Sequence, residues 1–424
     1  MNHSKNEQLM ARKAAATPRG VGVMASFFAE RAQGAELWDS EGQRWIDFAG
    51  GIAVMNVGHG HPKVLAAIEA QLKRFTHTCY QVVPYEGYIA LAEKLNQLTP
   101  GSHAKKTAFF STGAEAIENA IKIARAHTKR SGVIAFGGAF HGRSMFAVAL
   151  TGKMQPYKAG FGPFPPEIYH APFPCHNASL DETKKAMQHL FKADIEPSRV
   201  AAIVFEPVQG EGGFNVIQRE AVHWLRELCD EHGIVLIADE IQTGFGRTGT
   251  MFAMEQFGIV PDLMTIAKSL AAGLPLSAVT GRAEIMDAPA PGGLGGTYAG
   301  NPLAVAAAHA VIDVMAEERL PERGAELGAQ LKALLNSLRQ QVPQIADVRG
   351  LGAMVAVEFT ARDSTPDAAF TKRVQAEALK GKLILLGCGV NANVLRFLFP
   401  LNTPQMIFDE ALGILRASLL AAES

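Results

Sequence analysis

Two stretches decide the fold of this chain: Ile234-Val235-Leu236-Ile237-Ala238-Asp239 and Leu263-Met264-Thr265-Ile266-Ala267-Lys268. Each is a short apolar run of the kind that forms a buried strand, and each ends on a charged residue. The segment between them is long enough for a crossover helix, so we expect two parallel strands with neighbouring carboxyl ends. Open α/β sheets bind ligands at this edge. The two charged residues therefore predict a ligand site.

The chemistry of Lys268 and Asp239 suits pyridoxal 5'-phosphate (PLP). An apolar environment lowers the pKa of a lysine and frees its amine to attack a carbonyl, as a Schiff-base lysine must. A carboxylate beside the pyridine nitrogen of PLP keeps that nitrogen protonated, so that the ring accepts electrons. For either residue taken alone, an incidental loop lysine or a helix-capping aspartate is an equal alternative.

The alternation of apolar runs and amphipathic stretches extends from about residue 62 to residue 315. Further strands are predicted at 133–136, 202–205 and 277–279. Helices are predicted after Pro62, around 117–124, from 222 to a stop at Gly233, and from Pro302 to Met315. The pattern predicts an α/β domain with a mainly parallel sheet covered by helices.

The pattern changes after residue 320. A polar amphipathic helix at 325–341 and strands at 354–359, 383–386 and 394–399 predict a smaller α+β domain. A chain of 424 residues also exceeds the roughly 250–300 residues of a single core. We expect three parts, which are an N-terminal segment packing with the small domain (residues 1–61), a large cofactor-binding domain (62–319) and a C-terminal small domain (320–424).

Composition excludes several classes of function. With 40 basic and 41 acidic residues, the chain has no charge excess that would favour nucleic acid or an anionic membrane. The stretch from Met1 to Arg19 has no apolar run of the length that a secretory signal or a spanning helix needs, so we expect a cytoplasmic protein. The four cysteines show no C-x-x-C spacing and are expected to be reduced.

Two further motifs suit a flat, phosphorylated cofactor. Thr112-Gly113-Ala114 leads into a predicted helix, whose free amides could bind a phosphate, although ordinary helix capping explains the same residues. Phe140 follows the strand at 133–136 and could stack on the cofactor ring or pack in the core. Arg143 is a rigid fork of donors suited to a substrate carboxylate.

Arg396 lies in an apolar strand, Val394-Leu395-Arg396-Phe397, and must point outward or meet an anion. Glu206 and Glu211 flank a glycine-rich turn after a buried strand. One of them could be the partner of Arg396, or both could be solvated loop acids.

Two other motifs are set aside. Gly244-Phe245-Gly246-Arg247-Thr248-Gly249 matches G-x-G-x-x-G, but it begins too far beyond its strand and contains an arginine, so a dinucleotide site is rejected. His59-Gly60-His61 has no third ligand nearby and precedes Pro62, so we expect a helix entrance and no metal.

Taken together and in this order, these motifs resemble those of the class III (ω) aminotransferases, which are PLP enzymes of fold type I. The likeness runs from Pro18-Arg19-Gly20 to Val348-Arg349-Gly350-Leu351-Gly352. Gly293 to Pro302 and Asn393 to Phe397 look most like bacterial 4-aminobutyrate:2-oxoglutarate aminotransferases. The resemblance implies a large seven-stranded-type sheet domain and a homodimer or a dimer of dimers.

The resemblance also implies a role for each site residue. Lys268 would carry PLP as a Schiff base and shuttle a proton, while Asp239 would pair with the pyridine nitrogen. The other implied cofactor contacts are Gly113 and Ala114 to the phosphate, Thr297 to the phosphate from the partner subunit, Phe140 to the ring face, and Gln242 to the phenolic oxygen. The implied substrate contacts are Ile52 and Gln81 in the channel, Arg143 on the distal carboxylate, and Arg396, which would pair with Glu211 until 2-oxoglutarate or glutamate arrives; Glu206 belongs to the same group.

The implied reaction is transamination of 4-aminobutyrate with 2-oxoglutarate, giving succinate semialdehyde and glutamate. A 5-aminovalerate or (acetyl)ornithine aminotransferase is the nearest alternative, followed by an aminomutase or a decarboxylase on the same fold. A non-catalytic PLP sensor would normally carry a DNA-binding module, and we expect none here, because no N-terminal basic helix-turn-helix remains after the fold is counted.

Overall fold

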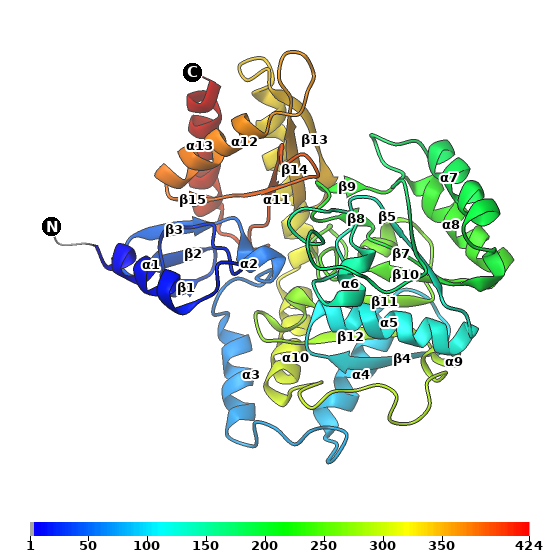
Figure 1. Ribbon diagram of the computed structural model, residues 1–424. Helices are drawn as coiled ribbons and strands as arrows, with labels where there is room; N and C mark the ends of the chain where they lie inside the picture. The colour runs from blue at the N-terminus through cyan, green and yellow to red at the C-terminus, as the bar shows by residue number, and fades with distance from the viewer. Residues whose placement is uncertain (1–3, 424) are drawn as a thin grey trace.

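The computed structural model describes residues 4–423 and is built around a mixed sheet of seven strands in the order β4-β12-β11-β10-β7-β5-β6 (Figure 1). These strands are β4 (Lys105–Phe110), β5 (Gly132–Phe136), β6 (Ile168–Ala171), β7 (Val200–Phe205), β10 (Val235–Asp239), β11 (Leu263–Ile266) and β12 (Ser277–Arg282). The four central strands β5, β7, β10 and β11 pair in parallel, whereas β12 runs antiparallel to β11 and β4. The predicted mainly parallel sheet is confirmed.

The apolar runs form strands because both faces of the sheet are covered by helices. Every residue of β5, β7, β10 and β11 is buried. Alternate residues of these strands pack on α5 (Gly113–Thr128) on one face, and the others pack on α8 (Arg219–His232) and α10 (Pro302–Glu317) on the opposite face. Central strands buried on both faces therefore show no polar alternation in their sequence.

The ends of these helices follow from local chemistry. Thr112 and Glu115 form a reciprocal capping box at the start of α5, and Asn301 caps α10 ahead of Pro302. Gly233 ends α8 at φ 63°, in the left-handed region that glycine adopts without strain. The predicted starts and stops at these residues are confirmed.

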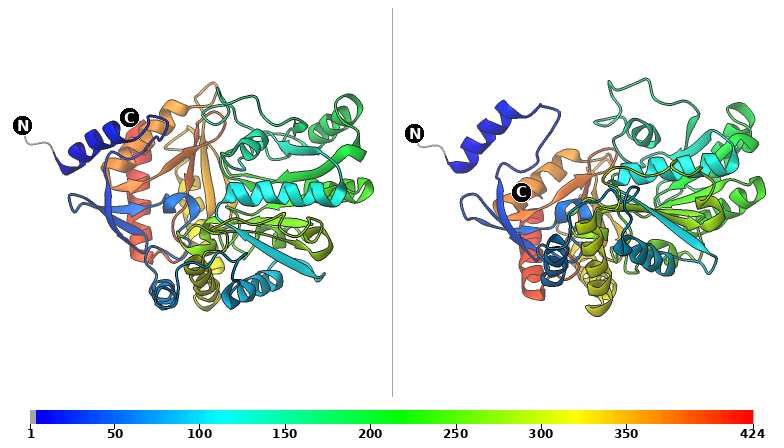
Figure 2. Two further views of the ribbon diagram at one scale, coloured as in Figure 1. Left: turned by 60° about the horizontal axis from the view of Figure 1, so that its bottom comes forward. Right: turned by 90° about the horizontal axis from the view of Figure 1, so that it is seen from below.

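Two smaller sheets lie beside the large one. Strands β1 (Ala29–Gln33), β2 (Glu36–Asp39) and β3 (Arg44–Asp47) form one sheet with β15 (Leu383–Ile384), while β13 (Ile345–Leu351), β14 (Met354–Phe359), β17 (Val394–Phe397) and β16 (Leu386–Cys388) form the other. Both further views show the N-terminal strands against the C-terminal part of the chain (Figure 2). The prediction of a single strand at 383–386 is wrong, because β15 pairs with β3 and β16 pairs with β17.

The remaining elements complete the layers around the sheets. They are α1 (Lys5–Ala16), α2 (Gly50–Ala53), α3 (Pro62–Leu72), α4 (Glu86–Leu98), α6 (Met145–Leu150), α7 (Leu180–Ala193), α9 (Ala283–Met286), α11 (Leu320–Ser337), α12 (Ala368–Lys380), α13 (Gln405–Glu423), and the short strands β8 (Val208–Gln209) and β9 (Asn215–Val216). Helix α11 begins and ends earlier than the predicted 325–341, and Pro321 in its first turn favours the earlier start.

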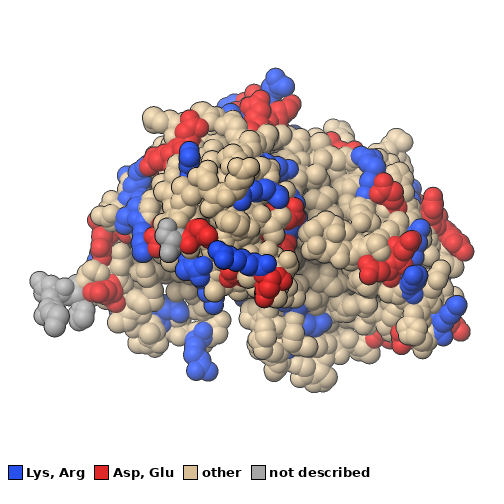
Figure 3. Space-filling view, turned by 90° about the horizontal axis from the view of Figure 1, so that it is seen from above, with Lys and Arg blue, Asp and Glu red and all other residues tan. Residues whose placement is uncertain are grey.

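We propose the domain limits expected from the sequence, with residues 62–319 as the large domain and residues 1–61 beside the small domain of 320–424. Within residues 4–423, none of the helices combines the length and the hydropathy needed to cross a bilayer. Basic and acidic side chains are interspersed over the face shown in Figure 3.

Candidate active site

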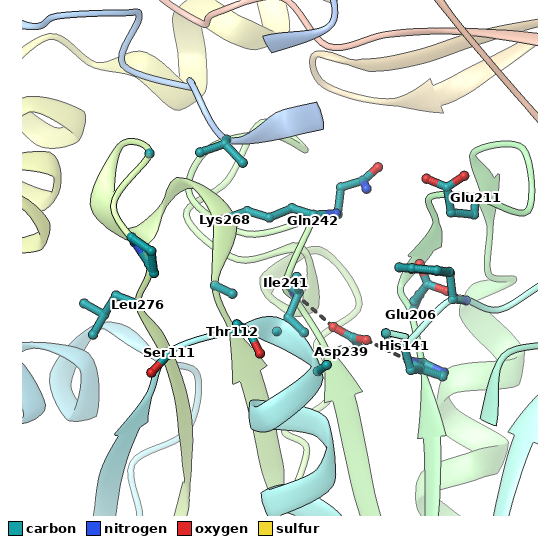
Figure 4. Close-up of a pocket in the computed structure, with 18 of the residues that line it drawn as sticks. Ser111, Thr112, His141, Glu206, Glu211, Asp239, Ile241, Gln242, Lys268 and Leu276 are labelled. Carbon is teal, nitrogen blue, oxygen red and sulfur yellow. Dashed lines mark hydrogen bonds and ion pairs between the residues drawn. The ribbon is translucent and has the colours of Figure 1, made fainter. Parts of the chain in front are cut away.

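A cavity of about 370 Å³ opens at the carboxyl ends of β10 and β11 (Figure 4). Asp239 is the last residue of β10, and Lys268 lies just beyond Ile266, the last residue of β11. The sequence-predicted site residues that line this cavity are Gly113, Ala114, Phe140, Glu206, Glu211, Asp239, Gln242 and Lys268. Parallel pairing of β10 and β11 thus brings together the two residues that the sequence singled out.

Lys268 is held in an unusual backbone conformation. Its φ of 46° is in the left-handed region, which is uncommon for a residue with a side chain, and it opens a short 3-10 helix. Such backbone strain persists where the surrounding structure enforces it, as at catalytic sites. Burial lowers the pKa of Lys268 to about 8, so about a tenth of the amine is neutral at pH 7, far more than for an ordinary lysine.

Asp239 is fixed by three donors. The Ile241 amide and the Thr265 hydroxyl each lie 3.1 Å from Oδ1, and His141 Nδ1 lies 2.7 Å from Oδ2. Burial alone would lower the pKa of His141, but the hydrogen bond and charge of Asp239 raise it above its ordinary value. The carboxylate is therefore fixed in one orientation, beside an imidazole that favours its protonated form.

The turn before α5 is capped by its own side chains, and this capping leaves two backbone amides free. Thr112 Oγ1 accepts from the Glu115 amide, and the Glu115 carboxylate accepts from the Thr112 amide. Gly113 and Ala114 are the first two helical residues, so their N–H groups have no carbonyl four residues earlier within the helix. Capping uses Thr112 and Glu115, which leaves the amides of Gly113 and Ala114 at the positive end of the helix for an anion.

Gly142 allows the segment carrying Phe140 to approach this turn. Its φ is 138°, and a Cβ there would lie 2.7 Å from the Cβ of Ala114. The Phe140 ring lines the cavity, 4.8 Å between centroids from the ring of Tyr157. Gln242 lies in the cavity wall with its Oε1 buried and without a hydrogen-bond partner among the described residues.

Arg396 meets an anion and does not point outward. It is 4% exposed, and its Nη1 lies 2.6 Å from Glu211 Oε1. Burial would raise the pKa of Glu211, but the charge of Arg396 holds it below its ordinary value. Burial would lower the pKa of Arg396, and Glu211 raises it. The ion pair keeps both groups charged.

Glu206, the other carboxylate of the turn, has different partners. It accepts from the amides of Phe140 and Gly210, each at 2.9 Å. Burial raises the pKa of Glu206 to about 7. Of the two acids that the sequence offered to Arg396, Glu211 is the partner and Glu206 orders the backbone beneath Phe140.

The other predicted site residues lie outside the cavity lining. Arg143 is exposed, and its guanidinium carbon lies 5.4 Å from the centre of the Tyr157 ring. Ile52 is 45% exposed at a φ of 63°. Gln81 donates to the Leu294 carbonyl, and Thr297 is exposed.

Sequence reasoning missed two contributors, His141 and Tyr157. His141 was visible beside Phe140, but only the fold shows that its imidazole lies against Asp239. Tyr157 is in a loop without periodicity, and its hydroxyl donates to Glu211 Oε2 at 3.1 Å.

The two motifs set aside have structural partners. Arg247 is completely buried and donates to the Phe399 carbonyl and to Asn56 Oδ1. These two hydrogen bonds join the glycine-rich turn to the N-terminal and C-terminal parts of the chain. His59 Nε2 bonds Asp47, and His61 caps α3 through the Lys63 amide.

A family model described as aminotransferase class III matches residues 16–419. The chain belongs to the class III aminotransferases. Members of this family use PLP, and the ornithine aminotransferase of Toxoplasma gondii, a solved relative, has PLP at partial occupancy in its active site.

Two curated relatives of this class III aminotransferase are each 54% identical to it. The 4-aminobutyrate aminotransferase GabT of Escherichia coli aligns over 97% of this chain and 98% of its own length. The 5-aminovalerate aminotransferase DavT of Pseudomonas putida aligns over 97% of both chains.

Among solved structures, a transaminase from the marine bacterium Virgibacillus superposes with a TM-score of 0.92 at 25% identity, over 98% of this chain and 99% of its own. The Toxoplasma gondii ornithine aminotransferase gives a TM-score of 0.86 at 31% identity, over 98% and 95%. The expected fold and family are confirmed.

The cavity of the class III aminotransferase fits PLP in chemical character. It offers a weakly basic lysine for an aldehyde, a fixed carboxylate for a ring nitrogen, free amides at a helix start for a phosphate, and an unpartnered amide oxygen at Gln242.

Proposed function

We propose that this chain catalyses transamination of 4-aminobutyrate with 2-oxoglutarate, giving succinate semialdehyde and glutamate. The observation that carries the proposal is the buried pair of Arg396 and Glu211 beside a lysine of lowered pKa. An arginine that is neutralised by a nearby glutamate suits an enzyme that must accept a substrate with one carboxylate and, in turn, a substrate with two.

The residues that would hold the cofactor each match one of its functional groups. Lys268 would bind the aldehyde, Asp239 the pyridine nitrogen, and the amides of Gly113 and Ala114 the phosphate. Phe140 would cover the ring face, and Gln242 would reach the phenolic oxygen. When bound, PLP supplies an electron sink for bond breaking at the reacting carbon of the substrate.

Lys268 is the residue that would move the proton. Its amine is the only lysine nitrogen lining the cavity among the described residues, and its pKa of about 8 lets it accept and return a proton near neutral pH. Asp239 is held in place by His141, so the carboxylate that would meet the pyridine nitrogen keeps one orientation.

The two arginines would recognise the carboxylates of the substrates. Arg143 is exposed beside the cavity and would bind the distal carboxylate of either substrate. With 4-aminobutyrate there is no second carboxylate, so Glu211 neutralises Arg396. Glutamate or 2-oxoglutarate would displace Glu211 and take Arg396 through its α-carboxylate. Ile52 and Gln81 would line the approach, with Glu206 supporting Phe140.

The second candidate function is 5-aminovalerate transamination. The 5-aminovalerate aminotransferase of Pseudomonas putida is as similar to this chain as the 4-aminobutyrate aminotransferase of Escherichia coli. One methylene changes binding in such a pocket by only about 1–3 kcal/mol, so the same residues serve both donors. The two arginines disfavour an aminomutase or a decarboxylase, which has no need for alternating carboxylate substrates.

We also propose a homodimer, or a dimer of dimers, acting in the cytoplasm without nucleic acid or membrane as partner. Thr297 is exposed and would complete the phosphate site of the other subunit. Exposed apolar side chains that such an interface would cover include Val82, Val83 and Ile89.

A panel of amino donors with 2-oxoglutarate tests the substrate. We expect 4-aminobutyrate to have the highest kcat/KM, 5-aminovalerate to react within about two orders of magnitude of it, and β-alanine and ornithine to be poorer. β-Alanine is too short to span Arg143 and Lys268, and the α-ammonium of ornithine would find Glu211 already paired with Arg396. A clear preference for ornithine or its acetylated form would refute the 4-aminobutyrate assignment.

A further inference from the structure

Tyr157 lies at the point where three parts of the site meet. Its hydroxyl donates to Glu211 Oε2 at 3.1 Å, and its ring lies 4.8 Å from Phe140. The guanidinium of Arg143 lies over the same ring, at 5.4 Å. None of the roles described above uses this tyrosine.

The two oxygens of Glu211 are shared between two donors. Oε1 binds Arg396 Nη1 at 2.6 Å, and Oε2 accepts from Tyr157. Burial, followed by the charge of Glu211, raises the pKa of Tyr157 to about 12, so the hydroxyl carries its proton at any physiological pH. The tyrosine is therefore a permanent donor that holds the carboxylate in the orientation that covers Arg396.

We propose that Tyr157 is a specificity-determining positioning residue, which holds Glu211 on Arg396 and thereby favours amino donors with a single carboxylate. This inference rests on the proposed function. Loss of the hydroxyl would weaken the paired state, so Arg396 would be released more readily to a ligand with two carboxylates. Tyr157 therefore sets the population of the state in which Glu211 is paired with Arg396. It does not set the affinity of Arg143 for a carboxylate.

The test uses the holoenzyme and its Tyr157→Phe variant. Phenylalanine keeps the ring that contacts Phe140 and Arg143 and removes only the donor to Glu211. Two unreactive probes report on the two states: butyrate, with one carboxylate, and glutarate, with two. Their Kd values are measured by calorimetry, and kcat/KM is measured for 4-aminobutyrate and for glutamate.

A hydrogen bond to a charged group corresponds to about tenfold to hundredfold in an equilibrium constant. We therefore expect Tyr157→Phe to bind glutarate about tenfold more tightly and butyrate with unchanged affinity. The ratio of kcat/KM for 4-aminobutyrate to that for glutamate should fall by a similar factor. Unchanged or weaker binding of glutarate would overturn the proposal, since it would mean that the hydroxyl does not favour the paired state.

Two further variants separate positioning from packing. In Glu211→Gln, the negative charge that pairs with Arg396 is absent. The double variant Glu211→Gln/Tyr157→Phe should therefore bind glutarate with the same Kd as Glu211→Gln alone. An equal gain in both backgrounds would show that Tyr157 acts by another route and would refute the inference. Tyr169→Phe is the matched control, because Tyr169 lies on β6, does not line the cavity, and donates its hydroxyl to the Asp194 carbonyl at 3.5 Å.

The binding measurements also distinguish the two proposals. If wild-type protein turns over neither 4-aminobutyrate nor glutamate, the proposed function fails. The effect of Tyr157 on the access of glutarate to Arg396 is still read directly from the Kd values.

Discussion

Replacing Arg396 with alanine separates the two halves of the proposed reaction. In the structure Arg396 is 4% exposed and its Nη1 lies 2.6 Å from Glu211 Oε1. The variant therefore leaves a buried carboxylate that keeps a hydrogen bond from the Tyr157 hydroxyl. It also removes the group that would bind the α-carboxylate of 2-oxoglutarate. Truncating one member of a desolvated pair costs about 2–5 kcal/mol, which is roughly 30- to several-thousand-fold in kcat/KM.

The loss should be concentrated in one half-reaction. With 2-oxoglutarate or glutamate, Arg396 would contact the substrate, and the full loss is expected. With 4-aminobutyrate, Arg396 contacts Glu211, so the loss should stay within about tenfold. Arg143→Ala should show the opposite bias in relative terms, since 4-aminobutyrate has no other carboxylate with which to bind.

Single-turnover absorbance of the enzyme, recorded with each substrate separately, measures the two halves. Arg396→Lys keeps the charge without the planar fork and should fall between wild type and Arg396→Ala. Lys380→Ala, which removes an exposed ion pair with Glu377, controls for loss of a cation elsewhere and should be silent. Equal losses in both halves for Arg143→Ala and Arg396→Ala would refute the assignment of the two arginines.

Four further predictions concern the cofactor site. Lys268→Ala should abolish transamination while the protein still binds PLP without a covalent link, as seen by absorbance and dialysis; normal turnover would rule out its catalytic role. Because burial lowers the pKa of Lys268 from 10.5 to about 8, covalent capture of PLP by apoprotein should accelerate with pH and be half-maximal near pH 8. Over the same window, from about 8 to 10.5, the unfolded chain binds more protons at this lysine than the folded one, so its contribution to the free energy of unfolding of apoprotein should rise with pH, as chemical denaturation would measure. His141→Ala removes the 2.7 Å partner of Asp239 and should weaken PLP binding about tenfold or more in a fluorescence titration, whereas unchanged affinity would show that Asp239 is held well enough by its other donors.

The centre of the large sheet could be predicted from the sequence because its strands are buried on both faces. The edge strands could not, since β4 begins with two lysines and β6 is only Ile168–Ala171. The antiparallel direction of β12 was also invisible, because an apolar run carries no mark of the direction of its neighbour. An apolar run also does not show where a chain leaves one sheet for another, so 383–386 was predicted as one strand.

The site could be predicted where a charged residue directly follows or ends an apolar strand, as Lys268 and Asp239 do. The residues alone left Glu206 and Glu211 as equal partners for Arg396, since both lie on one turn. The family resemblance implied Glu211, and the structure places Glu211 against Arg396 and gives Glu206 to backbone amides. Tyr157 gave no signal, because a loop tyrosine has no periodicity and its meaning depends on the carboxylate that it contacts.

The pairing of β3 with β15 has a consequence for synthesis on the ribosome. The sheet that holds Arg44 is completed only when Leu383 and Ile384 have emerged, and Arg44 also binds Glu410 on α13. Until then β3 exposes an unpaired edge, which is the kind of surface that other chains can join. The first strands to be translated are thus among the last to gain all their partners, and the edge of β3 stays open until the final part of the chain has left the ribosome.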